Sequence, residues 1–228
     1  MVSRPALSRE QSRAVDELAD REFHIPGLIL MENAGRGCAD LLAAQSPRQV
    51  LICCGPGNNG GDGYVIARHL DLYGIPVKIA LFCSPDRIRG DALTNFQIIR
   101  SAGLPILDGT SPDPGESFEQ AIEECDWVVD ALVGTGVTSA PREPVASAIR
   151  RINQAQAKVL AIDIPSGLDC DTGQPHDPTV EADLTATFVT PKSGYERSEA
   201  QRFLGTVHVI DIGTPRALLD RVFSSLGS

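Results

Sequence analysis

Residues 51–70 read LICCGPGNNGGDGYVIARHL, an apolar run that leads into a glycine-rich loop and then into a helix-like pattern. Five of the nine residues from Gly55 to Gly63 are glycine, more than an ordinary turn requires. The segment Gly55–Gly60 matches the spacing G-x-G-x-x-G, in which backbone N–H groups approach the pyrophosphate of a dinucleotide. A strand, a glycine-rich loop and a helix in this order predict a Rossmann-like unit that binds a ligand at the loop.

Two features argue against a standard NAD-dependent dehydrogenase. We expect Asp62 to cap a helix at Asp62–Tyr73, where its carboxylate would repel a pyrophosphate bound at that helix end in the usual way. The second expected strand, Val77–Phe82, is followed by Cys83 and Ser84 in place of the acidic residue that normally binds the ribose. The loop therefore indicates nucleotide binding without indicating hydride transfer.

Strands and helices alternate along most of the chain. Ser8 and Gln11 have the spacing of a capping box at the start of the first expected helix. We expect strands at Gln49–Cys54, Val77–Phe82, Leu104–Leu107, Asp126–Leu132, Lys158–Asp163, Leu184–Thr190 and Thr206–Ile210. We expect helices at Ser8–Phe23, Pro26–Ala44, Asp62–Tyr73, Asp91–Ala102, Glu116–Glu124 and Pro144–Gln154.

This alternation of apolar strands with amphipathic helices indicates a parallel sheet covered on both faces. The predicted fold class is α/β, a Rossmann-like three-layer α/β/α sandwich with a mostly parallel, doubly wound sheet. No linker divides residues 1–228, so we expect a single domain with a core at about residues 8–215. The last strands lack long helices between them, which favours an antiparallel arrangement at part of that edge.

Composition narrows the class of protein. The formal net charge of the 228 residues is -10, which opposes binding to nucleic acid or anionic lipid through a general electrostatic field. No apolar run approaches the roughly 20 residues that span a membrane, and the N-terminal segment lacks a secretory pattern. Six scattered cysteines without a C-x-x-C pair indicate reduced, mostly buried thiols. We therefore expect a cytoplasmic protein.

Polar side chains follow the strands that should meet at one edge of the sheet, where open α/β proteins bind their ligands. These are Asp130 in WVVDALVGTG, Asp163 and Ser166 in AIDIPSG, and Lys192 in PKSGY. Each also has a structural interpretation: Asp130 as a hydrogen-bonded core carboxylate, Asp163 and Ser166 as turn caps, and Lys192 as a surface lysine. Their common location favours a functional site.

Several motifs occur together in order: LMENAGRG, CGPGNNGGDGYVIARHL, DALVGTG, AIDIPSGLDCDTG, TPKSGY and VHVIDIGTP. Over about residues 8–215 they closely resemble the YjeF N-terminal domain family, the NAD(P)H-hydrate epimerases. The resemblance implies interconversion of the R and S forms of NADHX and NADPHX, the hydrated forms of the reduced cofactors. It also implies a bound potassium ion (K+) and a homodimer.

The resemblance further implies roles for individual residues. Potassium would be held by Asn59, Asp130 and Ser166, with backbone carbonyls, and Asp163 would contact the reacting ring with help from Lys192. From the chemistry of the reaction we choose Asp163 as the acid/base, and we expect Asp62 to cap its helix and shape the loop without transferring a proton. The residues expected to bind substrate are Asn58, Asn59, Gly60, Gly61, Asp62, Gly134, Thr135, Gly136, Val137, Thr138, Ser139, Ala140 and Asp163. In the loop after Gly136, small residues stand where many relatives have a basic one.

Two alternatives to an epimerase stay open from the sequence. A dehydrogenase lacks support because no hydride-transfer His or Tyr constellation is evident. A non-catalytic nucleotide-binding or interaction module of the same fold is the second alternative, and the presence of Asn59, Asp130, Asp163 and Lys192 argues against it. Many bacterial relatives carry a fused C-terminal dehydratase domain. This chain ends at Ser228, so we expect a separate NAD(P)HX dehydratase to work with it.

Overall fold

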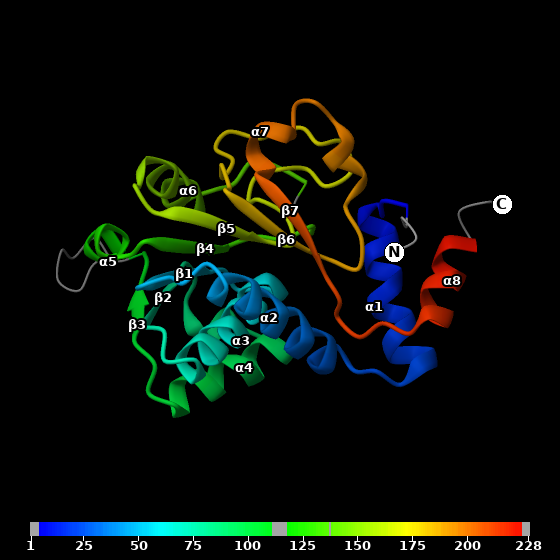
Figure 1. The fold of residues 1–228 in the computed structure, drawn as a ribbon, viewed down its shortest axis with the longest axis horizontal. Helices are drawn as coiled ribbons and strands as arrows, with labels where there is room; N and C mark the ends of the chain where they lie inside the picture. Colours follow the sequence, from blue (N-terminus) through cyan, green and yellow to red (C-terminus); the bar gives the residue numbers. More distant parts are fainter. Residues whose placement is uncertain (1–4, 111–117, 137, 225–228) are drawn as a thin grey trace.

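The computed structural model describes residues 5–110, 118–136 and 138–224. Its centre is a seven-stranded sheet in the order β3-β2-β1-β4-β5-β6-β7 (Figure 1). Every neighbouring pair of these strands runs parallel. The strands are β1 Val50–Cys54, β2 Val77–Leu81, β3 Ile106–Asp108, β4 Trp127–Ala131, β5 Lys158–Ile162, β6 Leu184–Phe188 and β7 Thr206–Ile210. The predicted Rossmann-like α/β class is confirmed.

Helices cover both faces of the sheet, which gives three layers. In Figure 1, α2, α3 and α4 lie below the sheet, α5 and α6 lie above it, and α1 and α8 stand together beyond one end. The helices are α1 Arg9–Phe23, α2 Gly27–Ala43, α3 Asn58–Leu72, α4 Gly90–Ser101, α5 Phe118–Glu124, α6 Val145–Gln154, α7 Gln201–Leu204 and α8 Arg216–Ser224, with short 3-10 turns η1 Pro85–Arg87 and η2 Ser193–Glu196. Residues 116 and 117 of the helix predicted at 116–124 lie outside the described residues.

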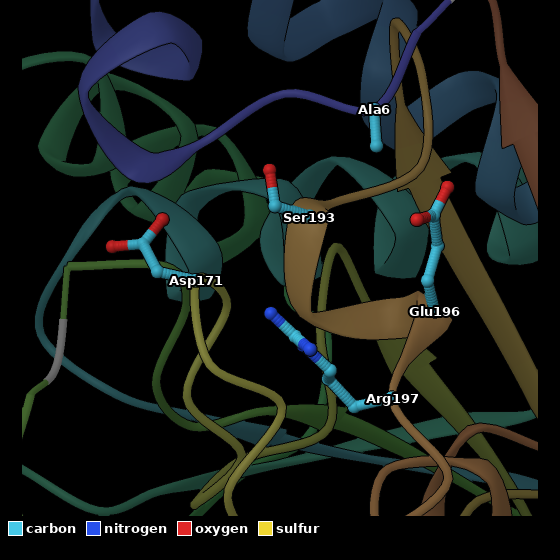
Figure 2. Close-up of a pocket in the computed structure, with 5 residues that line it drawn as sticks. All are labelled: Ala6, Asp171, Ser193, Glu196 and Arg197. Atoms are coloured by element: carbon cyan, nitrogen blue, oxygen red, sulfur yellow. The ribbon is translucent and has the colours of Figure 1, made fainter.

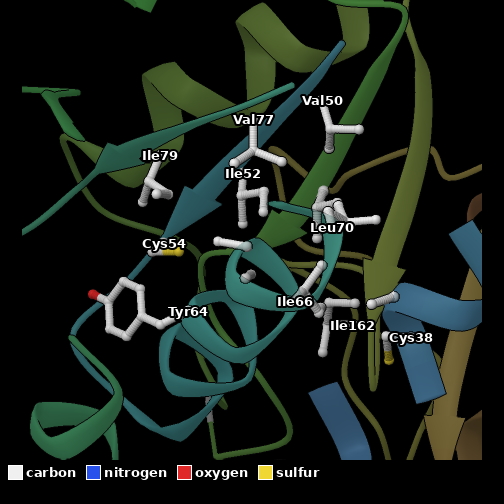
Figure 3. Close-up of a cluster of buried hydrophobic side chains, with 14 of the residues drawn as sticks. Cys38, Val50, Ile52, Cys54, Tyr64, Ile66, Leu70, Val77, Ile79 and Ile162 are labelled. Atoms are coloured by element: carbon white, nitrogen blue, oxygen red, sulfur yellow. The ribbon is translucent and has the colours of Figure 1, made fainter. Parts of the chain in front are cut away.

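Two apolar cores lie on opposite faces of the sheet because successive strand side chains alternate. Val50, Ile52 and Cys54 of β1 join the core under α2, α3 and α4, whose packing around Tyr64 and Ile66 is drawn in Figure 3. The intervening β1 residues, Leu51 and Cys53, join the core under α5 and α6. All six cysteines are free and buried, as predicted. Among the described residues, no helix is long and apolar enough to cross a membrane.

The strand order reverses between β1 and β4. The chain first builds outward from β1 to β2 and β3, and then crosses back to place β4 on the other side of β1. Loops that follow the carboxyl ends of two strands at such a switch point diverge, and ligands bind between them. In this protein those loops are the glycine-rich segment after Cys54 and the segment that begins at Leu132.

The expectation of an antiparallel edge is wrong. β5 pairs with β6, and β6 with β7, in parallel register. Two parallel strands need a connection of about a dozen residues or more. That connection usually contains a helix, but it does not have to. Residues 163–183 connect β5 to β6 without a helix, and residues 189–205 connect β6 to β7 through only η2 and α7. The missing long helices therefore did not indicate strand direction.

The N-terminal segment is tied to the carboxyl edge of the sheet. Ser8 and Gln11 form the predicted capping box at the start of α1. Just before this cap, the Leu7 N–H donates to the Pro191 carbonyl at 2.9 Å, and the Ser193 N–H donates to the Leu7 carbonyl at 3.0 Å. The segment that carries Lys192 is thus bridged to the residue that precedes α1.

Candidate active site

The glycine-rich loop fits against β4 because it has no side chains. A Cβ on Gly55 would clash with the Leu132 carbonyl, and a Cβ on Gly60 would clash with the Gly55 carbonyl. The helix after the loop begins at Asn58, four residues earlier than predicted, with Gly57 as its N-cap. Glycine and asparagine in the sequence indicated a loop, but close packing of Gly60 and Gly61 on their neighbours holds them in the first helical turn.

Asp62 does not cap a helix, so the prediction of a capping role is wrong. It lies inside α3, is only 7% exposed, and its carboxyl group makes no hydrogen bond with another described residue. Burial, and then the negative charges of Asp163 and Asp16, raise its pKa well above the usual range. Asp62 is therefore a buried acid that tends to keep its proton and lies near the candidate catalytic residues.

Asp163 and Lys192 form a buried ion pair between two loops of the carboxyl edge. Lys192 Nζ lies 2.6 Å from Asp163 Oδ1, and Lys192 is 2% exposed. The amine also donates to Thr187 Oγ1 at 3.0 Å and to the Phe188 carbonyl at 3.2 Å. These three acceptors match the three N–H groups of an ammonium ion. The interpretation of Lys192 as a solvated surface residue is wrong.

Among the described residues, hydrogen bonds reach one of the two carboxylate oxygens of Asp163. Oδ1 accepts from Lys192, from Thr187 Oγ1 at 3.3 Å and from the Phe188 N–H at 3.3 Å. Oδ2 has no hydrogen-bond partner among the described residues, and the side chain is 14% exposed. Oδ2 is therefore the oxygen that remains available to a bound molecule.

The strands that carry this pair end in two similar strained turns. Asp163 has φ 62° and sits in a turn closed by a hydrogen bond from the Ile164 N–H to the Ile162 carbonyl. Val189 has φ 68° and sits in a turn closed by a hydrogen bond from the Thr190 N–H to the Phe188 carbonyl. Three-residue turns with positive φ are rare, and such strain gathers at functional sites. Both turns hold the ion-pair residues at the rim.

Asp130 and Ser166 form a second buried cluster, at the end of β4. Asp130 is 0% exposed and accepts from Ser166 Oγ at 2.6 Å and from the Ser166 N–H at 2.8 Å. Burial raises the pKa of Asp130 to about 6, although the hydrogen bonds from Ser166 and Leu132 oppose this. No cationic side chain among the described residues pairs with this carboxylate.

Asn59 lies next to this cluster. Its Oδ1 would be 3.3 Å from a Cβ at Gly134, while its buried Nδ2 has no hydrogen-bond partner. The Val133 carbonyl lies 3.1 Å from Ser166 Oγ. The Asp130 carboxylate, the Ser166 hydroxyl and the Val133 carbonyl meet in one cluster, and the Asn59 amide oxygen lies beside the adjoining Gly134. Oxygens of these kinds are the ligands that hard cations prefer. The donor set therefore fits the potassium ion that the sequence resemblance implied.

The loop after β4 is exposed at the residues expected to bind substrate. Gly136, Thr138, Ser139 and Ala140 are exposed, and Val137 lies outside the described residues. Arg9, at the start of α1, donates through Nε to the Thr135 carbonyl at 2.6 Å. The structure thus places this loop at the surface beside α1, with its first part anchored.

Helix α1 contributes a residue that the sequence did not suggest. Burial, and then the charge of Asp163, raise the pKa of Asp16, whereas Lys192 lowers it. Asp16 is also exposed to solvent, so water screens part of this effect. No spacing in the sequence connects residue 16 to residues 163 and 192. The coupling arises because α1 lies across the carboxyl edge of the sheet.

Tyr195 supports Asp163 from the other side, donating its hydroxyl proton to the Asp163 carbonyl. The motif PKSGY contains this tyrosine, so the sequence carried a signal for it, but no spacing rule distinguished it from an ordinary core residue. Burial, and then the charge of Asp163, raise the pKa of Tyr195 well above its usual range. It therefore stays protonated and serves as a donor that holds the turn.

A polar pocket of about 460 Å³ lies beside this edge but does not include the ion pair. Figure 2 shows Arg197 pointing between Asp171 and Ser193, with Glu196 and Ala6 on the other side. Its two carboxylates and one guanidinium have no common preference for an anion or a cation. We therefore place the candidate site at Asp163 and the glycine loops, where Asp163 Oδ2 and the buried Asn59 Nδ2 have no hydrogen-bond partner among the described residues.

The chain is similar to several known proteins. The sequence profile of the family described as "YjeF-related protein N-terminus" matches residues 27–194. An NAD(P)H-hydrate epimerase from Pirellula staleyi is 47% identical over 94% of this chain and 95% of its own length. A bifunctional NAD(P)H-hydrate repair enzyme from Moorella thermoacetica is 40% identical over 90% of this chain and 40% of its own length. The crystal structure of yeast ynu0, YNL200c, has the same fold, with a TM-score of 0.81 at 22% identity over 96% of this chain and 93% of that one.

Proposed function

The chain belongs to the YjeF-related N-terminal family, and from this premise we propose that it is an NAD(P)H-hydrate epimerase. It is an isomerase that interconverts the R and S forms of hydrated NADH and NADPH. In the hydrate, the carbon that bears the hydroxyl group neighbours the ring nitrogen. The nitrogen can expel the hydroxyl to leave a planar iminium ion, and water that returns to the opposite face inverts the centre.

The enzyme must protonate a leaving hydroxyl and deprotonate an entering water, which is work for a positioned carboxyl group. The observation that carries our assignment is the free Oδ2 of Asp163. Oδ1 is held by Lys192, so the carboxylate cannot rotate freely, and Oδ2 remains open to a water or hydroxyl. We assign Asp163 as the acid/base and Lys192 as the residue that positions it and balances its charge.

We further propose that potassium binds between Asn59, Asp130 and Ser166, with the Val133 carbonyl. The fully buried Asp130 carboxylate without a cationic partner supports this assignment. A bound potassium ion would supply positive charge that holds the loops after β1, β4 and β5 together. The Asn59 amide would then be oriented toward the substrate loop at Gly134.

We expect substrate to contact the residues from Asn58 to Asp62 and from Gly134 to Ala140, which border the switch point of the sheet. A homodimer, a single domain over residues 1–228 and a cytoplasmic location stay predictions. A dehydratase that removes water from one epimer would consume the product. Epimerisation would let it clear both forms.

The test uses purified S- and R-hydrates of NADH and NADPH, with interconversion followed by chiral or reversed-phase chromatography. The wild-type protein should equilibrate the two forms faster than the spontaneous reaction. Asp163→Asn keeps the size of the side chain but cannot cycle a proton, so we expect a loss of about a hundred- to ten-thousand-fold in rate. Asp71→Asn, an exposed substitution on α3, should retain full activity.

Two results would contradict the proposal in different ways. A wild-type protein that binds the hydrates without interconverting them would support the non-catalytic module. An Asp163→Asn variant with near-normal rate would keep the function but move the proton transfer to another group, with Asp62 as the next candidate because its pKa is raised.

A further inference from the structure

Helix α1 faces the candidate site with one set of side chains. Arg9, Arg13 and Asp16 follow at i, i+4 and i+7, so they share one face of the helix. Arg9 donates to the Thr135 carbonyl, and Asp16 interacts electrostatically with Asp163. Arg13, between them on the same face, must therefore also be directed toward the site.

The exposed side chain of Arg13 reaches toward the glycine loop. Its Nη2 would be 3.9 Å from a Cβ at Gly136. On the same loop, Gly134 faces the amide of Asn59. The bare backbone of Gly134–Gly136 is therefore bordered by an amide on one side and a guanidinium on the other.

Arg13 is held near this position by the docking of α1. Arg9 pairs with Asp169 at 2.8 Å and with Asp171 at 3.0 Å. Leu7 is bridged to the loop of Lys192. Because the start of the helix is fixed at both loops, the Arg13 backbone needs little reordering when a ligand binds, which lowers the cost of binding.

The side chains around the site are mostly acidic, so a bound phosphate would need a positive group such as the Arg13 guanidinium. Asp16, Asp62 and Asp163 lie close enough to influence one another, and the net charge of the chain is -10. A dinucleotide carries at least two negative phosphate charges into this acidic surrounding. The segment from Gly134 to Ala140 has no basic residue. Arg13 forms no ion pair or hydrogen bond with another described residue, so its donors are available.

We propose that Arg13 binds a phosphate group of the substrate at the Gly134–Gly136 loop, an inference that rests on the proposed hydrated-dinucleotide substrate. Guanidinium groups bind phosphate oxygens with two parallel N–H donors, and the exposed loop N–H groups add donors from the backbone. The phosphate belongs either to the pyrophosphate, present in both substrates, or to the 2′-phosphate, present only in hydrated NADPH.

The experiment compares Arg13→Gln and Arg13→Lys with the wild-type protein and with Arg21→Gln. Arg21 lies on the same helix, two turns further on, and its side chain is 70% exposed, so its removal matches the change in charge. KM and kcat are measured with both hydrates. Affinities for ADP-ribose and 2′-phospho-ADP-ribose are measured by calorimetry at two salt concentrations. Thermal unfolding checks that each variant is folded.

We expect Arg13→Gln to raise KM about tenfold, the equivalent of one charge-assisted hydrogen bond, with kcat nearly unchanged. Arg13→Lys should recover part of this loss, and Arg21→Gln should behave as wild type. A rise for both hydrates and for ADP-ribose assigns the pyrophosphate. A rise only for hydrated NADPH and 2′-phospho-ADP-ribose assigns the 2′-phosphate.

Unchanged KM values together with unchanged affinities for both probes would overturn the inference. Failure of the proposed function has a different signature. The wild-type protein would then not epimerise the hydrates, and weaker binding of a probe by Arg13→Gln would still support the phosphate contact.

Discussion

The ends of β4 and β5 each present a carboxylate at the same edge of the sheet, Asp130 fully buried and Asp163 partly buried, and the two have different counter-charges. Asp163, after β5, has the Lys192 ammonium 2.6 Å away. Asp130, in β4, has only neutral donors from Ser166 and Leu132. The chain thus supplies its own counter-charge in one place and leaves the other to a proton or to an ion from solution.

This difference indicates a division of roles. An amine held by three acceptors orients the Asp163 carboxylate and provides its counter-charge, as an acid/base requires. A carboxylate with hydroxyl and amide oxygens around it, and no amine, is suited to a metal ion. Asp130 is fully buried, whereas the Asp163 side chain is 14% exposed. Burial and the charge of the nearest partner therefore both distinguish the two carboxylates.

The largest expected effect comes from removing the internal counter-charge. Lys192→Met keeps the apolar stem but leaves Asp163 buried without a cation, and breaking a buried pair costs about 3 kcal/mol or more. We expect this loss in the free energy of unfolding measured with urea. The double variant Asp163→Asn/Lys192→Met removes both charges and should recover part of that stability. A loss below about 1 kcal/mol in the single variant would show that water already screens the pair.

The second effect, of intermediate size, concerns the carboxylate without an amine. Potassium should raise the melting temperature of the wild-type protein above its value in sodium, because an ion that binds only the folded state stabilises it. Each kcal/mol corresponds to about 2–4 °C for a chain of this size. Asp130→Asn should abolish this difference. An equal response to both ions in the wild-type protein would remove the potassium assignment.

The pH dependence sharpens the same test. Burial raises the pKa of Asp130 to about 6, so without a bound cation the folded state holds this proton more tightly than the unfolded chain. The contribution of Asp130 to stability therefore falls as pH rises from about 4 to about 6. Potassium should offset that fall, and its effect on melting temperature should be larger at pH 7.5 than at pH 4.5. The pKa values of Asp62 and Asp16 are also raised, so they contribute to the same pH dependence. Asp130→Asn is therefore the control that isolates the part due to Asp130.

The smallest effect comes from a third carboxylate, nearer the surface. Although burial opposes ionisation, hydrogen bonds from Thr172 and from Arg9 hold the pKa of Asp169 at about 2. This stabilisation is complete above the unfolded pKa of about 4 and is lost as pH falls through about 2. In Asp169→Asn, the free energy of unfolding should fall less between about pH 4 and about pH 2 than in the wild-type protein. The difference should be on the order of 1 kcal/mol, because solvent screens part of the interaction. An unchanged acid transition would show that the Arg9–Asp169 pair does not stabilise the folded protein.

The sequence predicts the architecture better than it predicts contacts. Periodicity located every strand to within two residues, because apolar strands and amphipathic helices have distinct repeats. It misplaced the start of α3, because Gly60 and Gly61 enter the helix through packing on Gly55 and Met31, which no local pattern records. It also suggested an antiparallel edge, because the last strands lack long helices between them. A connection without a long helix can still join parallel strands, so the sequence did not determine their direction.

For the site, the sequence identified residue types but not their partners. Asp130, Asp163, Ser166 and Lys192 follow strands, so the rule for parallel sheets places them on one edge. The sequence does not show that Lys192 pairs with Asp163 or that Asp130 lacks an amine partner among the described residues. These pairings depend on how two separate loops place their side chains in three dimensions. Asp16 and Arg13 were missed because α1 precedes the sheet in the chain. Its docking on the Lys192 loop is visible only in three dimensions.

The left-handed backbone at Asp163 also limits how this site can change over generations. Among side chains, aspartate and asparagine tolerate φ 62° best, and glycine tolerates it without cost. A descendant that abandons the chemistry can keep its fold most easily by replacing this aspartate with asparagine or glycine, whereas valine or isoleucine would strain the end of β5. We therefore expect loss of activity in lineages of this fold to leave a recognisable trace at this position, distinct from random drift elsewhere on the rim.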